Sequence, residues 1–174
     1  MLEHHGDLWV FGYGSLIWRP GFAFVERVPA LLKGAHRTLC VYSYNHRGTP
    51  ERPGLVLGLD HGGACRGVAF RVEAHHRAET LAYLTEREQI SMVYREEFRS
   101  IVLQDGRRVK ALCYIVDRTH RQYARKMTRE ELLRLVGQGH GKSGPNPEYV
   151  RNTLLALKDL GIHDPTLAWL SDNL

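Results

Sequence analysis

The chain has 174 residues, of which 43% are hydrophobic and 25% are charged, and its formal net charge is +5 at neutral pH. This length and composition predict one globular domain spanning residues 1–174. Its three cysteines, an odd number without a C-x-x-C pair, argue against a disulfide scaffold or a cysteine zinc site. Because no apolar run reaches the ~20 residues of a membrane span and no secretion signal is present, we expect a cytoplasmic protein without a membrane partner.

The positive charge is concentrated in residues 107–129. This segment contains one acid, Asp117, and eight basic residues: Arg107, Arg108, Lys110, Arg118, Arg121, Arg125, Lys126 and Arg129. Such a cluster is either a solvated strand edge with its loop or a binding surface for nucleic acid. The segment's aromatic residues, Tyr114 and Tyr123, follow no known nucleic-acid-binding pattern, so we expect no nucleic-acid partner.

The expected elements begin with strands. Residues 8–11 form a short buried strand that runs into a glycine-rich turn, and residues 38–44 form a second strand. The proline- and glycine-rich residues 45–54 form a loop long enough to be functional. Two paired strands are then expected around a turn at residues 60–63, at residues 55–59 and 65–72.

Residues 74–89 predict a helix without glycine or proline. Strands at residues 101–103 and 109–116 flank Asp105-Gly106, a strong hairpin signal. A capping box at Thr128 opens a helix, and Asn146, as N-cap before a proline, opens another. The order favours an α+β domain on an antiparallel, barrel-like sheet over alternating βαβ units.

The turn after the first strand is the first candidate binding site. Glycines at positions 12 and 14 permit unusual backbone conformations and close approach of a ligand. Backbone N–H groups there can hold a carboxylate or polarise a carbonyl oxygen, and Ser15 and Tyr13 add polar groups. An ordinary glycine turn that joins two elements remains the alternative.

Glu88 is the candidate acid/base. Ala78, Leu81, Leu84 and Glu88 follow one helical stripe, so a carboxylate occupies a position where the pattern calls for leucine. Burial would raise its pKa towards that of a general base near neutral pH. The alternative is that the helix ends earlier and Glu88 points to water or pairs with an arginine. Glu86 and Glu96 lie off the stripe and are expected to be solvated.

Metal and nucleotide sites are not supported. The ten histidines show neither H-E-x-x-H nor paired ligand spacing. Gly141-Lys142-Ser143 ends like a P-loop, but Val136 stands where the motif needs glycine, and the segment follows a helix. We therefore expect no metal and no cofactor.

Four segments together resemble the ChaC-type γ-glutamylcyclotransferases, in the family's order and over nearly the whole chain. They are residues 10–18 (Val-Phe-Gly-Tyr-Gly-Ser-Leu-Ile-Trp), residues 46–50 with Pro53-Gly54, Tyr83-Leu84 with residues 87–89 and Tyr94, and residues 141–144 with Asn146, Glu148, Tyr149 and Val150. Residues 89–93, Gln-Ile-Ser-Met-Val, are longer and bulkier than the two-glycine segment of the shorter family members.

The resemblance implies a fold, an activity and a site. The fold is a small, mostly antiparallel β-barrel with flanking helices. The activity is a lyase reaction that cleaves glutathione, or another γ-glutamyl amine or peptide, into 5-oxoproline and a free amine. Glu88 falls on the family's catalytic glutamate. Tyr94 and Tyr149 are expected to hydrogen-bond the substrate, and either Arg47 or the basic cluster is expected to attract its negative charge. The family's substrate-binding loop falls on Gly12, Tyr13, Gly14, Ser15, Leu16 and Ile17.

Overall fold

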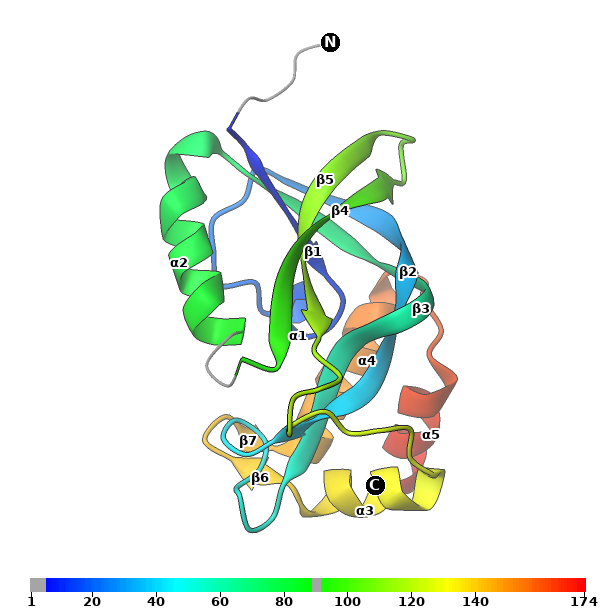
Figure 1. Ribbon diagram of the computed structural model, residues 1–174. Helices are drawn as coiled ribbons and strands as arrows, with labels where there is room; N and C mark the ends of the chain where they lie inside the picture. Colours follow the sequence, from blue (N-terminus) through cyan, green and yellow to red (C-terminus); the bar gives the residue numbers. More distant parts are fainter. Residues whose placement is uncertain (1–5, 89–91) are drawn as a thin grey trace. The chain divides into compact units, whose positions relative to one another are not determined.

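The computed structural model describes residues 6–88 and 92–174, which fold into two compact units (Figure 1). The first unit is built from Met1–Arg37 and Leu59–Asp117, and the second from Thr38–Gly58 and Arg118–Leu174. Two long strands, β2 (Glu26–Ser43) and β3 (Gly54–Val72), contribute to both units. The single domain expected from chain length stays a prediction.

The sheet is a closed barrel. Its strand order is β1-β3-β2-β4-β5, with β1 at Leu8–Gly12, β4 at Tyr94–Leu103 and β5 at Arg108–Val116. β1 pairs antiparallel with β3 and parallel with β5, which closes the barrel. The expected fold class, a small β-barrel with mostly antiparallel pairs and flanking helices, is confirmed.

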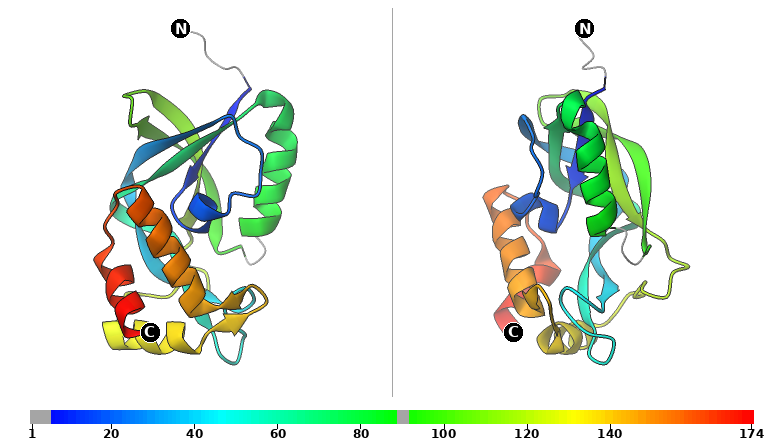
Figure 2. Two further views of the ribbon diagram at one scale, coloured as in Figure 1. Left: turned by 180° about the vertical axis from the view of Figure 1, so that it is seen from behind. Right: turned by 90° about the vertical axis from the view of Figure 1, so that its left-hand side faces the viewer.

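One hydrophobic cluster joins the barrel to the helix that carries the candidate acid/base. Helix α2 (Arg77–Glu88) follows a short 3₁₀ helix (Ala74–His76) and runs alongside the barrel strands in every view (Figures 1 and 2). Its Leu84 is buried against side chains from β1, β3, β5 and the turn after β1, namely Leu8, Val10, Leu16, Val72, Leu112 and Tyr114. Removing this apolar surface from water fixes α2 on the barrel.

Three strand predictions are wrong. Residues 55–59 and 65–72 are not a hairpin, because β3 continues through them as one strand. Gly62 and Gly63, with φ of 96° and 71°, adopt the left-handed conformation inside this strand without reversing the chain. β2 begins at Glu26 instead of Thr38, and β4 at Tyr94 instead of Ile101, because pairing with distant strands extends both beyond their apolar stretches.

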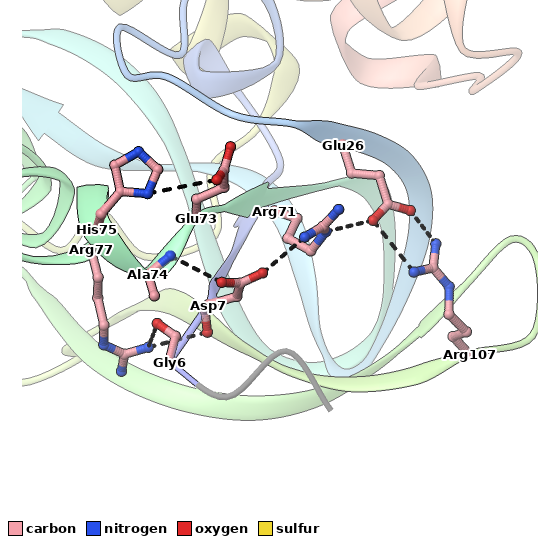
Figure 3. A network of polar contacts seen from close by, with 9 residues as sticks. All are labelled: Gly6, Asp7, Glu26, Arg71, Glu73, Ala74, His75, Arg77 and Arg107. Carbon is pink, nitrogen blue, oxygen red and sulfur yellow. Dashed lines mark hydrogen bonds and ion pairs between the residues drawn. The ribbon is translucent and has the colours of Figure 1, made fainter. Parts of the chain in front are cut away.

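The hairpin at Asp105-Gly106 is confirmed, and an ion-pair network ties it to the barrel (Figure 3). The carboxylate of Glu26 bonds the guanidinium groups of Arg107 and Arg71, and Arg71 also bonds Asp7 at 2.8 Å. Arg107 further pairs with Asp105 and lies 5.5 Å from the Trp9 ring centroid. The hydrogen bond from Arg107 holds the pKa of Glu26 below its ordinary value. Arg107, the first basic residue of the segment 107–129, therefore takes part in ion pairs within the barrel unit.

The second unit contains the helices α3 (Arg129–Gln138), α4 (Asn146–Asp159) and α5 (Pro165–Asn173), and the short strands β6 (His140–Gly141) and β7 (Gly144–Pro145). The capping box at Thr128 is confirmed. Asn146 is not the N-cap of α4, which is Pro145. The Asn146 side chain instead accepts a hydrogen bond from the backbone N–H of Leu55 and donates one to its C=O. Within the described part of the chain, no helix is long and apolar enough to cross a membrane.

Candidate functional site

The glycine-rich turn lies between β1 and α1 (Ser15–Trp18) and is held on both sides. Gly67 of β3 packs directly on it, since a Cβ there would lie 2.3 Å from the carbonyl oxygen of Gly12. The Arg37 guanidinium of β2 donates to the carbonyl of Tyr13 at 2.6 Å. The side chains of Leu16 and Ile17 are buried, so they anchor the turn in the first unit.

Glu88 is the last residue of α2 and lies on the buried face of that helix. Thr80 and Leu84 are buried at the two preceding i, i+4 positions, and the Glu88 side chain is only 14% exposed. Ala78, which the sequence placed on this stripe, is exposed, because the buried face follows Thr80 and lies about half a turn away from it. Burial raises the pKa of the Glu88 carboxyl, and the neighbouring Arg87 opposes the rise.

Arg87 links the turn to Glu88. Its guanidinium donates to the Ser15 hydroxyl at 3.0 Å and to the Tyr83 hydroxyl at 2.9 Å. It also donates to the backbone carbonyls of Arg19 and Pro20, just after α1. Its Nε lies 3.5 Å from a carboxylate oxygen of Glu88. The sequence pattern identified the Arg-Glu pair but gave Arg87 no role, because its partners are distant in sequence.

Tyr94, at the start of β4, packs against the hydrophobic cluster that contains Leu16 of the turn and Leu84 of α2. The structure therefore brings the 12–17 turn, Glu88 and Tyr94 together in the first unit. Glu96, expected to be solvated, accepts hydrogen bonds from the hydroxyls of Tyr114 and Thr85, although it is exposed. Burial and the neighbouring Glu96 and Glu88 raise the pKa of Tyr114, which keeps its phenol neutral.

Tyr149 lies in the second unit, on α4. Its hydroxyl accepts a hydrogen bond from the backbone N–H of Leu57, and the Arg47 guanidinium carbon lies 5.7 Å from its ring centroid. Arg47 is buried and donates to the carbonyl of Pro145. Within the unit these contacts join the family-like segments at residues 46–50 and 141–150. Substrate contact by Tyr149 or Arg47 stays a prediction.

The segment that departs from the family pattern is described only in part, since residues 89–91 lie outside the described residues. Met92 is exposed and has a φ of 62°, the left-handed region that methionine rarely adopts. Val93 is buried, and its carbonyl accepts the N–H of Asp117.

A cavity of about 410 Å³ in the second unit contains none of the predicted site residues. Its lining comes from β2, the following loop and the α3 region: Tyr42, Tyr44, Pro50, Pro53, Arg125, Met127, Glu131, Arg134 and Leu135. Of the eight basic residues in the segment, only Arg125 lines this cavity. Arg118 and Arg129 instead lie over the rings of Tyr123 and Trp169. Arg118, Arg125 and Arg129 of the segment therefore have different neighbours.

Gly21→Ala is expected to destabilise the protein by more than the ~1–2 kcal/mol typical of a left-handed alanine. Gly21 has a φ of 77°, and its new Cβ would lie 2.0 Å from the Tyr83 hydroxyl, the same group that accepts from Arg87. Gly161→Ala is the matched control, because its φ is 71° and no atom lies within 4 Å of the added Cβ. Urea unfolding of both variants measures the difference; equal losses would contradict the contact.

Comparisons with known proteins point to one protein family. The sequence model of ChaC-like proteins matches residues 8–173. The glutathione-specific gamma-glutamylcyclotransferase of Escherichia coli (strain K12) is 35% identical over 162 residues, which cover 93% of this chain and 70% of that protein. The enzyme of the same name from Schizosaccharomyces pombe is 30% identical, and the match covers 91% of this chain and 87% of that protein. A crystal structure of a gamma-glutamyl cyclotransferase specific to glutathione from yeast is 24% identical and superposes with a TM-score of 0.87 over 96% of this chain and 95% of that one. Because the family model matches almost the full length of the sequence and the barrel fold agrees with it, the chain belongs to the ChaC-like protein family.

Proposed function

We propose that the protein is a γ-glutamylcyclotransferase, a lyase that cleaves glutathione to 5-oxoproline and cysteinylglycine. The observation that carries the proposal is Glu88, a carboxylate with a raised pKa at the end of α2, linked through Arg87 to the turn after β1. The relatives in Escherichia coli and Schizosaccharomyces pombe have the glutathione-specific activity in their names.

The reaction needs one group that moves a proton twice. The α-ammonium of the γ-glutamyl residue loses a proton to Glu88, and the free amine attacks the γ-carbonyl carbon of the same molecule. The C–N bond to cysteinylglycine then breaks as Glu88 returns the proton to the departing nitrogen. The attacking nitrogen sheds a second proton as it becomes the lactam N–H, and the released amine takes up that proton to leave as an ammonium group. The carboxylate ends as it began, so this route consumes no other reactant.

The 12–17 turn supplies binding and orientation in this proposal. Its backbone N–H groups hold the substrate's α-carboxylate or the oxygen that becomes negative during attack. Holding the γ-glutamyl chain folded brings the amine and the carbonyl together and removes much of the entropic barrier. Ser15 and Tyr94 are proposed as further polar contacts with the substrate.

The acid limb of the kcat/KM profile is expected to lie above pH 4.5, the ordinary glutamate value. Burial favours the protonated form of Glu88, so the base is lost at a higher pH than in an exposed carboxylate. The limb is measured from initial rates across pH. Glu86→Gln, which alters an exposed carboxylate on the same helix, should leave it in place. A wild-type limb at or below pH 4.5 would contradict the role of Glu88.

The test of the substrate is a comparison of glutathione with other γ-glutamyl amines and dipeptides, following 5-oxoproline by chromatography. Preference for glutathione in kcat/KM supports the proposal. Preference for another γ-glutamyl compound supports the same reaction on the alternative substrate class, and no release from any of them rejects the function. We include a cytoplasmic location in the proposal, which three cysteines buried as thiols support.

A further inference from the structure

The Arg87 side chain donates hydrogen bonds to several groups at the proposed site. Its two terminal nitrogens donate to four oxygen atoms, in Ser15, Arg19, Pro20 and Tyr83, all within the first unit. Two of these are backbone carbonyls at the end of the short helix α1, where carbonyl groups lack intrahelical partners. The side chain is only 17% exposed, so these bonds are partly shielded from water.

The planar guanidinium is the group that this arrangement requires. It offers five N–H donors in a fixed fork, whereas an ammonium offers three donors around one point. A lysine at this position retains the positive charge but cannot reach the Ser15 hydroxyl and the carbonyls beyond α1 at the same time. Two properties of Arg87 can therefore be tested separately: the planar arrangement of its N–H donors, called its fork here, and its positive charge.

The charge acts on Glu88. Nε of Arg87 lies 3.5 Å from Oε1 of Glu88, and this cation favours the ionised carboxylate while burial disfavours it. Arg87 therefore keeps the carboxylate available as a base at a lower pH than burial alone would allow. The effect depends on the charge and not on the fork.

We infer that Arg87 is a positioning residue that holds the 12–17 turn in its substrate-binding shape through its fork while poising Glu88 as a base through its charge. The inference rests on the proposed function for its kinetic consequences. The hydrogen bonds and the ion pair of Arg87 support the positioning role independently of that function. Ser15 and Glu88, on two separate elements, meet through this one side chain.

Two variants test the two properties separately. Arg87→Lys retains the charge and loses the fork, so KM for glutathione is expected to rise on the order of 10- to 100-fold with the acid limb of kcat/KM unmoved. Arg87→Gln loses both, so KM rises similarly and the acid limb moves to higher pH. Arg77→Lys is the matched control, because Arg77 lies on the same helix and donates to the backbone of Gly6 and Asp7.

A binding measurement separates this inference from the proposed reaction. In a Glu88→Gln background, calorimetric titration with glutathione is expected to show affinity reduced 10- to 100-fold by the added Arg87→Lys change. If wild type releases no 5-oxoproline but the affinity still falls, the reaction is wrong and the positioning role stands. If Arg87→Lys and Arg87→Gln lower only the midpoint of unfolding, with KM, affinity and acid limb as in wild type, the positioning role is overturned.

Discussion

Glu88→Gln is expected to lower kcat by roughly 10²- to 10⁴-fold, the contribution typical of one general acid–base group. Glutamine has nearly the same shape but can neither accept the proton from the substrate's amine nor return it to the leaving nitrogen. Initial rates of 5-oxoproline release at saturating glutathione measure the loss. Full activity in this variant would remove Glu88 from the mechanism.

The same substitution is expected to stabilise the fold at neutral pH. Because the native pKa of Glu88 lies above the unfolded value of about 4.5, the native state binds more protons than the unfolded state above that pH, and stability falls as pH rises. Each pH unit between the two pKa values corresponds to about 1.4 kcal/mol. Glutamine removes this penalty. Urea unfolding should therefore show a gain for Glu88→Gln at pH 7 that disappears below pH 4.5.

The exposed Glu86 again provides the control. Glu86→Gln should change the free energy of unfolding by less than about 0.5 kcal/mol at either pH, as is usual for a surface position. A loss of stability in Glu88→Gln at pH 7 would mean that the charged carboxylate is net stabilising, contrary to its burial. Higher stability with lower activity in one variant identifies a group retained for function.

The largest expected loss of stability is at Asn146, in the second unit. Asn146→Ala leaves the backbone N–H and C=O of Leu55 without their partner in a site where Asn146 and Leu55 are both 0% exposed. An unpaired buried group costs about 1–3 kcal/mol, so the two together are expected to cost roughly 2–6 kcal/mol. The free energy of unfolding in urea measures this loss.

Two features of the site sharpen the Asn146 test. Added Cβ atoms at Gly54 and Gly139 would lie 2.6 Å and 2.8 Å from side-chain atoms of Asn146, so the surroundings are tightly packed. Asn152→Ala, at a half-buried position of the same helix, controls for helix propensity and should be close to neutral. A cost below about 1 kcal/mol at Asn146 would show that water replaces the side chain.

Local signals in the sequence predicted the elements that depend on local interactions. Asp105-Gly106 supports a tight reversal, and Thr128 with Glu131 forms a capping box within one helical turn, so both were predictable. At residues 60–63 the local signal was misleading. Gly62 and Gly63 look like a hairpin turn, but the barrel uses their left-handed conformations inside one long strand, and barrel closure depends on contacts that no short window contains.

The candidate site also contains residues that local sequence patterns predicted and residues that they did not. Helical periodicity placed Glu88 on the buried face of α2, although the face passes through Thr80 and not Ala78. The roles of Arg87, Gly21 and Asn146 were not predictable, because each is defined by a partner far along the chain. Arg87 meets Ser15, Gly21 meets Tyr83, and Asn146 meets Leu55.

The most direct test of the central claim compares glutathione with its N-acetylated form, whose α-nitrogen cannot act as the nucleophile. The account predicts equal molar amounts of 5-oxoproline and cysteinylglycine from glutathione, and no cleavage of the acetylated peptide at any enzyme concentration. Release of free glutamate from glutathione, or cleavage of the acetylated peptide, would contradict intramolecular attack and the role assigned to Glu88.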